Sequence, residues 1–297
     1  MPGKNKNKKS LLIKIAAAST VLIVFVATVI LCNISFSQPT PKISHEATLT
    51  TSQPLTEIKP IEARPINLTL TDPNAPKSTA LPILMYHFFY DPARGETGGD
   101  NNWLDVKTFE DQIKYLTDNN YYFPNWDEVK QYVAGQLSLP EKSIVLTDDD
   151  GSSSFFDLAV PILTKYKVPV TSFVITSWTD PKTINTDKNL VTFMSHSHDM
   201  HQAGCEGGHG GLFRCLDHDK AIADLTTSRN MIGGGDVFCY PFGDYTDQAI
   251  QELKEAGFAL AVTTEYGKAM IGSDPLLLPR IRISKTTDLA SFISTIQ

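Results

Sequence analysis

The sequence predicts an α/β fold in which a parallel sheet closes into a (β/α) barrel. Short apolar runs alternate in regular order with amphipathic stretches, an order typical of a parallel sheet covered by helices. About seven such units follow one another, and that number favours a barrel over an open sheet. Functional side chains of such barrels gather at the carboxyl ends of the strands.

Each predicted strand is a short apolar run, as expected for a strand that is buried on both faces. These runs are residues 82–87, 143–148, 170–175, 191–196, 237–242, 258–264 and 278–284. In the stretches between them apolar residues recur with helical spacing, which predicts amphipathic helices. The predicted helices are residues 107–119, 125–135, 155–166, 218–232 and 246–257.

The first 37 residues differ in kind from the rest of the chain. Five lysines within residues 1–14 precede an uncharged apolar run from Ile15 to Cys32. This pattern predicts either a membrane-spanning signal-anchor or a cleaved signal peptide, with the following residues outside the cytoplasm. We favour the anchor because the apolar run is long. The catalytic domain would then lie outside the cell membrane, or be secreted if the segment is cleaved.

Residues 38–80 form a predicted linker, and residues 81–297 form the predicted folded domain. The linker holds seven prolines and many Thr and Ser, without helical or strand periodicity. Such a composition predicts a disordered stalk. The net charge of -7 argues against a nucleic-acid partner.

Three consecutive aspartates, Asp148–Asp150, end one predicted strand and are followed by Gly151. Adjacent carboxylates repel one another, so the arrangement costs free energy unless a cation offsets it. The alternative is an acidic surface turn. The strand-end positions favour a functional site, because His87 and the pair Ser195–His196 also lie at strand ends.

Three histidines, His196, His198 and His201, lie within six residues after another predicted strand. A single histidine there is usually structural, whereas three histidines together favour a metal site. One carboxylate with two imidazoles is typical of a catalytic divalent-metal site. His196 and His201 come together only if the chain turns between them.

The motifs "LTDDDG", "HSHDMH" and "YPFG", with "ILMYH" before them and "LPRIRI" after, occur in a fixed order. In these motifs the chain resembles the polysaccharide deacetylases with a NodB-type domain, carbohydrate esterase family 4. The resemblance implies a distorted (β/α) barrel and removal of acetyl groups from N-acetylglucosamine polymers or acetylated xylan.

The resemblance assigns roles in the aspartate and histidine motifs. Gly151 sets the register, so that Asp149 corresponds to the catalytic base and Asp150 to a metal ligand. Asp148 replaces the usual apolar residue, which leaves open which two of the three aspartates act. A spacing of five residues between ligands, His196 and His201, resembles the branch that deacetylates poly-N-acetylglucosamine.

The third motif implies further site residues. Cys239 stands where the family has an arginine, so the arginine that steadies the base has to come from elsewhere, and Arg280 is the candidate. The backbone N–H of Phe242 corresponds to an oxyanion donor, and Tyr240 and Pro241 to substrate-binding residues. The C-terminal histidine motif that supplies the general acid is not visible in the sequence.

Cys205 and Cys215 flank a glycine-rich loop. Outside the cytoplasm a disulfide between them is the favoured interpretation. A zinc knuckle with His209 and His218, or free thiols, are the alternatives. Cys239, in a predicted strand, is expected to be a small buried apolar residue.

The sequence therefore predicts a membrane-tethered polysaccharide N-deacetylase, a hydrolase acting on peptidoglycan or poly-N-acetylglucosamine. We expect a divalent metal cofactor, zinc in the first place, with cobalt, manganese or nickel as alternatives. We also expect a monomer. Three rival functions are open: an acetylxylan esterase, a non-catalytic carbohydrate-binding relative, and a protein whose metal site is purely structural.

Overall fold

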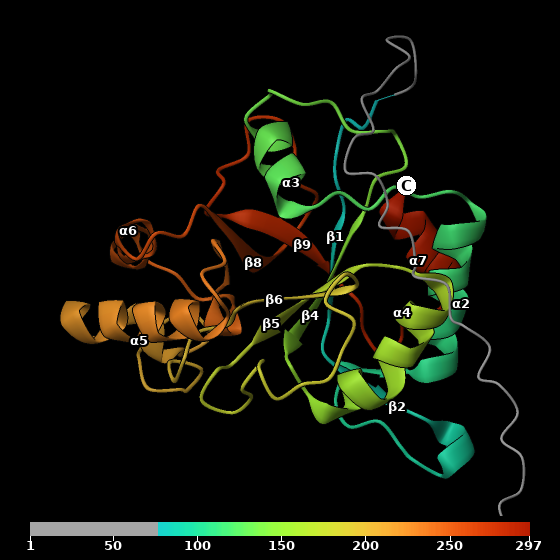
Figure 1. Cartoon of the computed structure of the whole chain (residues 1–297), viewed down its shortest axis with the longest axis horizontal. Helices are drawn as coiled ribbons and strands as arrows, with labels where there is room; N and C mark the ends of the chain where they lie inside the picture. Colours follow the sequence, from blue (N-terminus) through green and yellow to red (C-terminus); the bar gives the residue numbers. More distant parts are fainter. Residues whose placement is uncertain (1–76) are drawn as a thin grey trace, which may run out of the picture. The chain divides into compact units, whose positions relative to one another are not determined.

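The computed structural model describes residues 77–297. Their centre is a closed barrel of seven strands in the order β1-β4-β5-β6-β7-β8-β9 (Figure 1). The strands are β1 (Ile83–Tyr86), β4 (Val145–Asp150), β5 (Val170–Val174), β6 (Val191–Ser195), β7 (Val237–Cys239), β8 (Leu260–Tyr266) and β9 (Leu278–Arg282). All neighbouring strands are parallel, and β1 closes the barrel by pairing with both β4 and β9. The predicted parallel sheet and its closure are confirmed.

The strands form where the predicted apolar runs lie, and most of their residues are buried, although Thr192 of β6 is exposed. All five residues of β5 are buried, and β-branched and aromatic residues such as Val170 and Phe173 suit this environment. Strand β7 ends three residues earlier than predicted. A 3-10 turn, η4 (Pro241–Gly243), replaces the end of the predicted strand, because proline cannot donate to a ladder of hydrogen bonds.

Helices cover the outside of the barrel. They are α2 (Val106–Asp118), α3 (Trp126–Val133), α4 (Val160–Tyr166), α5 (His218–Met231), α6 (Asp247–Glu255) and α7 (Leu289–Ile296). A π-helical turn, η2 (Phe155–Ala159), leads into α4. In Figure 1, α2, α4 and α7 lie together on one side of the barrel, and α5 and α6 lie side by side on another.

Polar caps begin the helices at the places where the sequence leaves an apolar strand. The Asp105 carboxylate accepts the backbone N–H of Lys107 at the start of α2. At α3, Asn125 and Glu128 form a reciprocal capping box. Each such cap contributes about 1 kcal/mol to stability and fixes where the helix starts.

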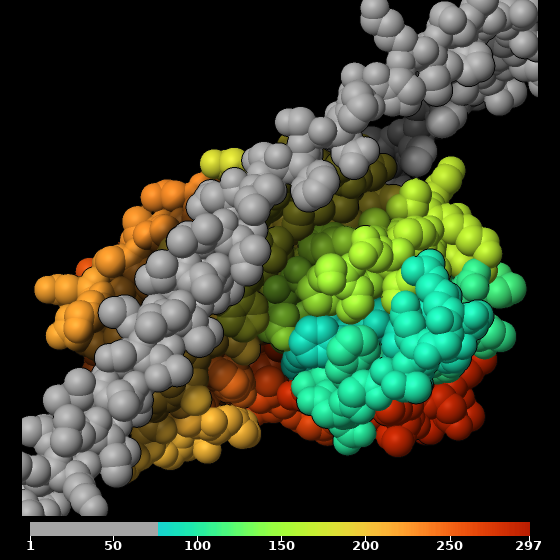
Figure 2. All heavy atoms as spheres, turned by 90° about the horizontal axis from the view of Figure 1, so that it is seen from below, coloured from blue at the N-terminus to red at the C-terminus, as the bar shows by residue number. Residues whose placement is uncertain are grey.

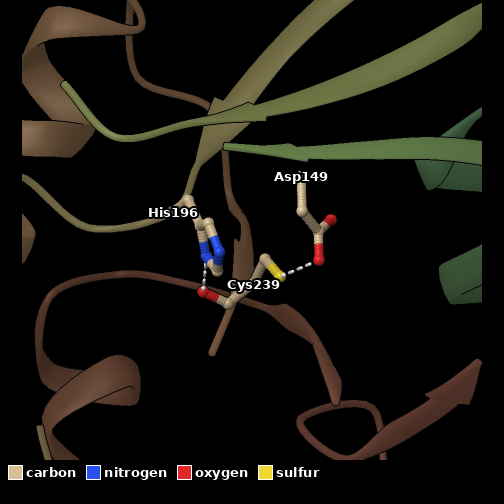
Figure 3. Close-up of side chains that lie close together, drawn as sticks. All are labelled: Asp149, His196 and Cys239. Carbon is tan, nitrogen blue, oxygen red and sulfur yellow. Dashed lines mark hydrogen bonds between the residues drawn. The ribbon is translucent and has the colours of Figure 1, made fainter. Parts of the chain in front are cut away.

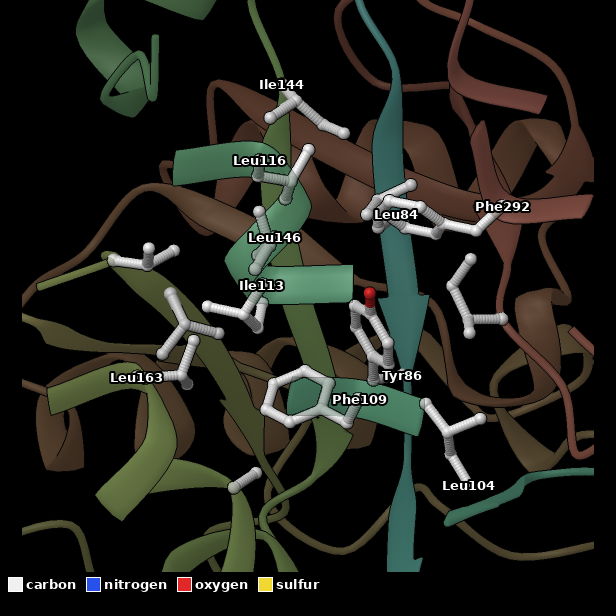
Figure 4. Packing of buried hydrophobic residues seen from close by; sticks show 14 of the residues in the cluster. Leu84, Tyr86, Leu104, Phe109, Ile113, Leu116, Ile144, Leu146, Leu163 and Phe292 are labelled. Atoms are coloured by element: carbon white, nitrogen blue, oxygen red, sulfur yellow. The ribbon is translucent and has the colours of Figure 1, made fainter. Parts of the chain in front are cut away.

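The largest apolar cluster fills the space between the barrel and the helices α2, α4 and α7 (Figure 4). Leu84 of β1 and Leu146 of β4 face Phe109 and Ile113 of α2, and Phe292 of α7 closes one end. Each of these side chains is at most 2% exposed. Burying one such side chain contributes about 1.5–3 kcal/mol, which holds the strands whose ends carry the polar residues.

Two features of the fold were not predicted. A short parallel pair, β2 (Phe88–Tyr90) and β3 (Trp103–Asp105), follows directly after β1, and α7 ends the chain. In Figure 2 the segment around β2 and β3, cyan to green, lies on the surface beside the yellow-green residues of η2 and α4. Strands of three residues carry too short a pattern to be read from sequence.

The predicted anchor, residues 1–37, and most of the predicted linker lie outside the described residues. Backbone pairing begins at Lys77, which bridges to Pro140, four residues before the predicted domain boundary. Among residues 77–297, no helix has both the length and the apolar character that a membrane span requires.

Candidate active site

Polar side chains from several strands meet at the carboxyl end of the barrel. His87 follows β1, Asp149 and Asp150 end β4, His196 follows β6, and Arg280 lies in β9. Strands β1, β4 and β9 are neighbours through barrel closure, so residues far apart in sequence come into contact. This end of a barrel is where chemistry is expected.

The aspartate run leaves the barrel through a tight left-handed turn. Asp150 has a φ of 73° and Gly151 a φ of 63°. A Cβ added to Gly151 would lie 2.7 Å from the Val174 Cγ1 atom, so glycine is required there. A non-glycine residue held at positive φ is strained, and this turn directs the Asp150 carboxylate toward the histidines.

Asp150, His196 and His201 form a cluster of donor atoms that fits a metal ion. The Asp150 Oδ1 atom lies 3.5 Å from His196 Nε2 and 3.4 Å from His201 Nε2. One donor atom from each residue lies within 4.8 Å of the other two. Asp150 Oδ1 is buried and forms no hydrogen bond of ordinary geometry. A buried carboxylate oxygen facing two imidazole nitrogens is what a divalent cation would satisfy.

The protein fixes the orientation of both imidazoles. His196 Nδ1 lies 2.8 Å from the Cys239 carbonyl oxygen, so a proton on Nδ1 leaves Nε2 free to bind a cation. Burial, helped by the nearby His196, lowers the pKa of His201 to about 4. His201 is therefore neutral near pH 7, the form that can bind a metal.

The chain turns between the two histidines as the five-residue spacing requires. Ser197 adopts a φ of 73°, and the Asp224 carboxylate accepts the backbone N–H groups of His198 and Asp199 at 2.6 and 2.7 Å. The His198 ring points elsewhere, with Nδ1 3.0 Å from Thr176 Oγ1. His198 thus lies outside the cluster. Asp224 was missed, because no sequence motif connects it to this turn.

Asp149 is held by Arg280 in a bidentate ion pair. Asp149 Oδ1 and Oδ2 each lie 2.7 Å from one guanidinium nitrogen, and Arg280 is completely buried. Arg280 also donates to the Thr263 carbonyl oxygen at 2.8 Å. Burial alone would raise the pKa of Asp149, but the Arg280 charge outweighs it and holds the pKa well below its usual range. The contact expected between Arg280 and Asp149 is present.

Cys239 lies beside this ion pair, and Figure 3 shows its side chain next to Asp149. Its Sγ atom is 3.4 Å from Asp149 Oδ2 and 3.2 Å from an Arg280 guanidinium nitrogen. Burial raises the pKa of the Cys239 thiol, so the thiol stays neutral and donates weakly to the carboxylate. The small side chain leaves room for Arg280 to reach Asp149 from β9. Cys239 is buried, as predicted.

Asp148 points away from the site. Its side chain is completely buried and accepts a hydrogen bond from Ser172 Oγ at 3.1 Å. Burial and the neighbouring Asp149 charge raise the pKa of Asp148 well above its usual value, which favours the neutral acid. Because successive residues of a strand face opposite sides, Asp149 and not Asp148 faces Arg280.

His87 is a site residue to which the sequence analysis gave no role. Its Nε2 atom lies 3.9 Å from Asp149 Oδ2, and its Nδ1 atom is buried without a hydrogen-bond partner. Burial lowers the pKa of His87 below its ordinary value. The sequence placed His87 at a strand end, but only the closure of the barrel through β1 shows that it adjoins Asp149.

The "YPFG" turn presents Phe242 to the site. Phe242 has a φ of 58°, its ring stacks on His201 at 4.6 Å between centroids, and its backbone N–H donates to no other group of residues 77–297. The assignment of Tyr240 and Pro241 to substrate binding stays a prediction. Both are buried, and Tyr240 is 0% exposed among Phe213 and other aromatic residues, so their side chains shape the turn from inside.

The favoured disulfide between Cys205 and Cys215 is confirmed. The zinc knuckle is wrong, because both sulfur atoms are in the disulfide and His218 Nδ1 faces Glu252. The loop that the disulfide closes is bound to the turn after β7. The buried Asp244 carboxylate accepts the backbone N–H groups of His209 and Gly211 at 2.9 Å.

The fold and the site define a class of protein: a (β/α) barrel with an Asp–His–His cluster beside an arginine-paired carboxylate, an arrangement suited to hydrolysis. Residues 136–261 match the family model named polysaccharide deacetylase. This match lies within the folded domain and agrees with the family resemblance that the motifs carry.

Several relatives and solved structures are similar to this chain. A poly-beta-1,6-N-acetyl-D-glucosamine N-deacetylase of Staphylococcus aureus (strain MRSA252) is 28% identical over 59% of this chain, which spans 66% of that relative. The Streptococcus pyogenes deacetylase PplD, in complex with acetate, superimposes with a TM-score of 0.62 at 24% identity, over 74% of this chain and 99% of PplD. IcaB from Ammonifex degensii has a TM-score of 0.62 at 22% identity, over 74% of this chain and 98% of IcaB. These two structures share the fold.

Proposed function

We propose that the chain is a metal-dependent N-deacetylase acting on N-acetylglucosamine residues of a cell-surface polysaccharide. The observation that carries the proposal is one juxtaposition: the cluster of Asp150, His196 and His201 adjoins the carboxylate of Asp149, which Arg280 keeps ionised. A cation site and a base in contact are the two parts that hydrolysis of an amide needs.

The cation would be held by Asp150, His196 and His201, with zinc the first candidate and cobalt, manganese or nickel alternatives. A divalent ion bound there supplies Lewis-acid polarisation of the acetyl carbonyl and of the attacking water. Asp149 takes the proton of that water. It is suited to this role because the Arg280 contact keeps it in the basic form and fixes its direction.

The remaining steps fall to Phe242 and His87. The free backbone N–H of Phe242 donates to the oxyanion that develops on the acetyl oxygen. His87 donates a proton to the leaving nitrogen of the sugar. Because burial lowers the pKa of His87 and favours its neutral form, the proton reaches it from Asp149, which has taken it from the water and lies 3.9 Å from His87 Nε2. His87 thereby fills the general-acid role for which no C-terminal motif was found.

Poly-N-acetylglucosamine is the substrate that we favour over peptidoglycan. The five-residue spacing of His196 and His201 and the printed name of the Staphylococcus aureus relative support this choice. We further propose that the catalytic domain acts outside the cytoplasm, tethered through residues 1–37. The lysines and the apolar run of that segment, and a disulfide between Cys205 and Cys215, support an extracytoplasmic location.

The test is acetate release by the full chain from β-1,6-linked N-acetylglucosamine oligomers, from peptidoglycan and from acetylxylan. We expect acetate from the first substrate, loss of release after chelation, and recovery when Zn²⁺ or Co²⁺ is added. Release from acetylxylan alone would favour the esterase. Folded, metal-loaded protein that releases acetate from none of the three would refute the proposal.

A further inference from the structure

Trp178 is a large apolar side chain exposed beside the candidate active site. It follows β5, and 62% of its surface is exposed. Its ring centroid lies 5.6 Å from that of His201, with the ring planes at 68°. The other exposed large apolar residues among residues 77–297 are Tyr266, Met270 and Ile271, and none of them makes a ring contact with the Asp150–His196–His201 cluster.

The backbone around Trp178 is tied to the site at several points. The N–H groups of Trp178 and Thr179 both donate to the Ile175 carbonyl oxygen at 3.0 Å. Ser177 N–H donates to the His198 carbonyl oxygen at 3.0 Å, and Thr179 Oγ1 donates to the Gly151 carbonyl oxygen at 3.4 Å. An exposed indole on a backbone held this way is preorganised and loses little freedom when it binds a ligand.

We propose that Trp178 is a stacking platform for a pyranose ring of the polysaccharide, at or next to the residue that is deacetylated. This inference rests on the proposed function. The C–H face of a pyranose ring is apolar, so stacking on an aromatic ring removes it from water. Aromatic side chains commonly line ligand sites for this reason. The contact with His201 places such a sugar within reach of the cation cluster.

A structural role is the competing explanation. His201 lies between Trp178 and Phe242, so the indole could serve only to hold the His201 ring. The two roles differ in what they affect. A stacking platform changes affinity for an oligosaccharide and leaves metal binding and the turnover of a small ester unaffected. A support for His201 changes metal content and lowers the turnover of every substrate alike.

The first experiment measures binding, so that it does not depend on turnover. The Asp149→Asn chain, loaded with Zn²⁺, is titrated calorimetrically with a β-1,6-linked N-acetylglucosamine pentamer, with and without Trp178→Ala or Trp178→Phe. We expect Trp178→Ala to raise the dissociation constant for the pentamer about tenfold, which corresponds to a loss of about 1.4 kcal/mol of binding free energy. Trp178→Phe should retain most of the affinity. Met270→Ala is the matched control, because Met270 is also an exposed large apolar residue, at 54%. Its neighbour Ala269 bridges to Leu81, which precedes β1, whereas the candidate site lies at the carboxyl ends of the strands.

The second experiment measures turnover in chains that carry Asp149. For Trp178→Ala we expect KM for the pentamer to rise about tenfold, with kcat, metal content and hydrolysis of 4-nitrophenyl acetate unchanged. Unchanged pentamer affinity, or a parallel loss of metal and of ester hydrolysis, would overturn the inference. Absence of acetate release by the wild-type chain would instead count against the proposed function, while the calorimetric comparison still decides the role of Trp178.

Discussion

The three consecutive aspartates differ in their surroundings although they are neighbours in the chain. Asp150 faces two imidazoles, Asp149 faces the Arg280 guanidinium, and Asp148 faces the Ser172 hydroxyl on the other side of the strand. Their pKa values are accordingly shifted in different directions: below the usual value for Asp149 and Asp150, and well above it for Asp148. Like-charge repulsion along the run is thus reduced, because the raised pKa of Asp148 favours its neutral form and the other two aspartates have cationic or metal-binding partners.

The raised pKa of Asp148 predicts a pH-dependent stability. Because its pKa is raised in the folded state, the native protein keeps a proton that the unfolded chain releases above about pH 4. The contribution of Asp148 to stability therefore falls as the pH rises from about 4 toward its folded pKa. An asparagine side chain does not titrate, so Asp148→Asn should gain stability relative to wild type between about pH 4.5 and pH 7.5.

Urea unfolding of metal-free wild type and Asp148→Asn at these two pH values checks this prediction. The free energy of unfolding of Asp148→Asn, relative to that of wild type, should be higher at pH 7.5 than at pH 4.5. The exposed Asp127→Asn serves as a control and should show no such shift. A difference that is the same at both pH values would mean that Asp148 is ionised in the folded protein.

The proposed role of His87 predicts a loss of turnover without loss of metal. His87→Ala removes the proton donor 3.9 Å from Asp149 but none of the cation ligands. We expect kcat for acetate release to fall about 10²- to 10⁴-fold, the usual contribution of general acid–base catalysis. Metal content, measured by emission spectroscopy, should stay at the wild-type level. Wild-type turnover in His87→Ala would exclude His87 as the general acid.

The sequence indicated candidate site residues only where they belong to a short motif. Asp149, Asp150, His196 and His201 were found because short motifs carry them. Arg280 was a candidate by exclusion. His87 could not be paired with Asp149, because 62 residues separate the two in the chain and only barrel closure joins them. The burial of Tyr240 depends on aromatic neighbours such as Phe213, which no local pattern shows.

At the element scale, the disulfide-closed loop supports the turn η4. Cys205 and Cys215 close the loop, and Asp244, next to η4, binds its backbone N–H groups. Gly211 lies against the ring of Phe242, because a Cβ at Gly211 would be 3.0 Å from Phe242 Cδ2. The loop thereby buttresses the residue that stacks on His201.

Removal of this disulfide should lower stability. For a closed loop with a sequence separation of 10, the chain-entropy model predicts a contribution of about 2–3 kcal/mol. The Cys205→Ser/Cys215→Ser chain should therefore unfold about 4–10 °C below wild type. Differential scanning calorimetry measures this. Reductant should lower the melting temperature of wild type and leave the double variant unchanged; equal sensitivity of both would contradict the prediction.

Strands such as β1 and β5 were predictable because they are short apolar runs that are buried on both faces. The short pair β2 and β3 escaped detection, since three residues carry no measurable period. Helix α7 was missed although it begins with an N-cap, Asp288, whose carboxylate accepts the Ser291 N–H. Its apolar residues Leu289, Phe292, Ile293 and Ile296 do recur with helical spacing, but over a stretch of only 8 residues, which is shorter than the window of about 11–18 residues in which such a pattern is usually read.

At the scale of the whole molecule, the barrel holds the site rigid by joining its first and last strands. Residues from β1, β4, β6 and β9 converge, so a cation bound at Asp150 and the two histidines would link β4 to the segment after β6. A ligand that binds only the folded state stabilises it in proportion to the logarithm of its concentration.

Metal loading should therefore raise the melting temperature of the domain. At a free Zn²⁺ concentration of about one hundred times the dissociation constant, the gain is about 2.7 kcal/mol, which corresponds to about 5–10 °C for a domain of this size. Scanning calorimetry of chelated and reloaded protein measures it. His198→Ala should keep the increase and His201→Ala should lose it; the reverse result would make His198 the ligand.

The central claim is that neighbouring aspartates have separate tasks, with Asp149 as base and Asp150 as metal ligand. The most direct test measures bound metal and acetate release together in Asp149→Asn and Asp150→Asn, with near-ultraviolet circular dichroism to verify folding. We predict that Asp149→Asn keeps its metal and loses about 10²- to 10⁴-fold in turnover, while Asp150→Asn loses both metal and turnover. Wild-type turnover in folded Asp149→Asn, with turnover abolished in Asp148→Asn, would contradict the account.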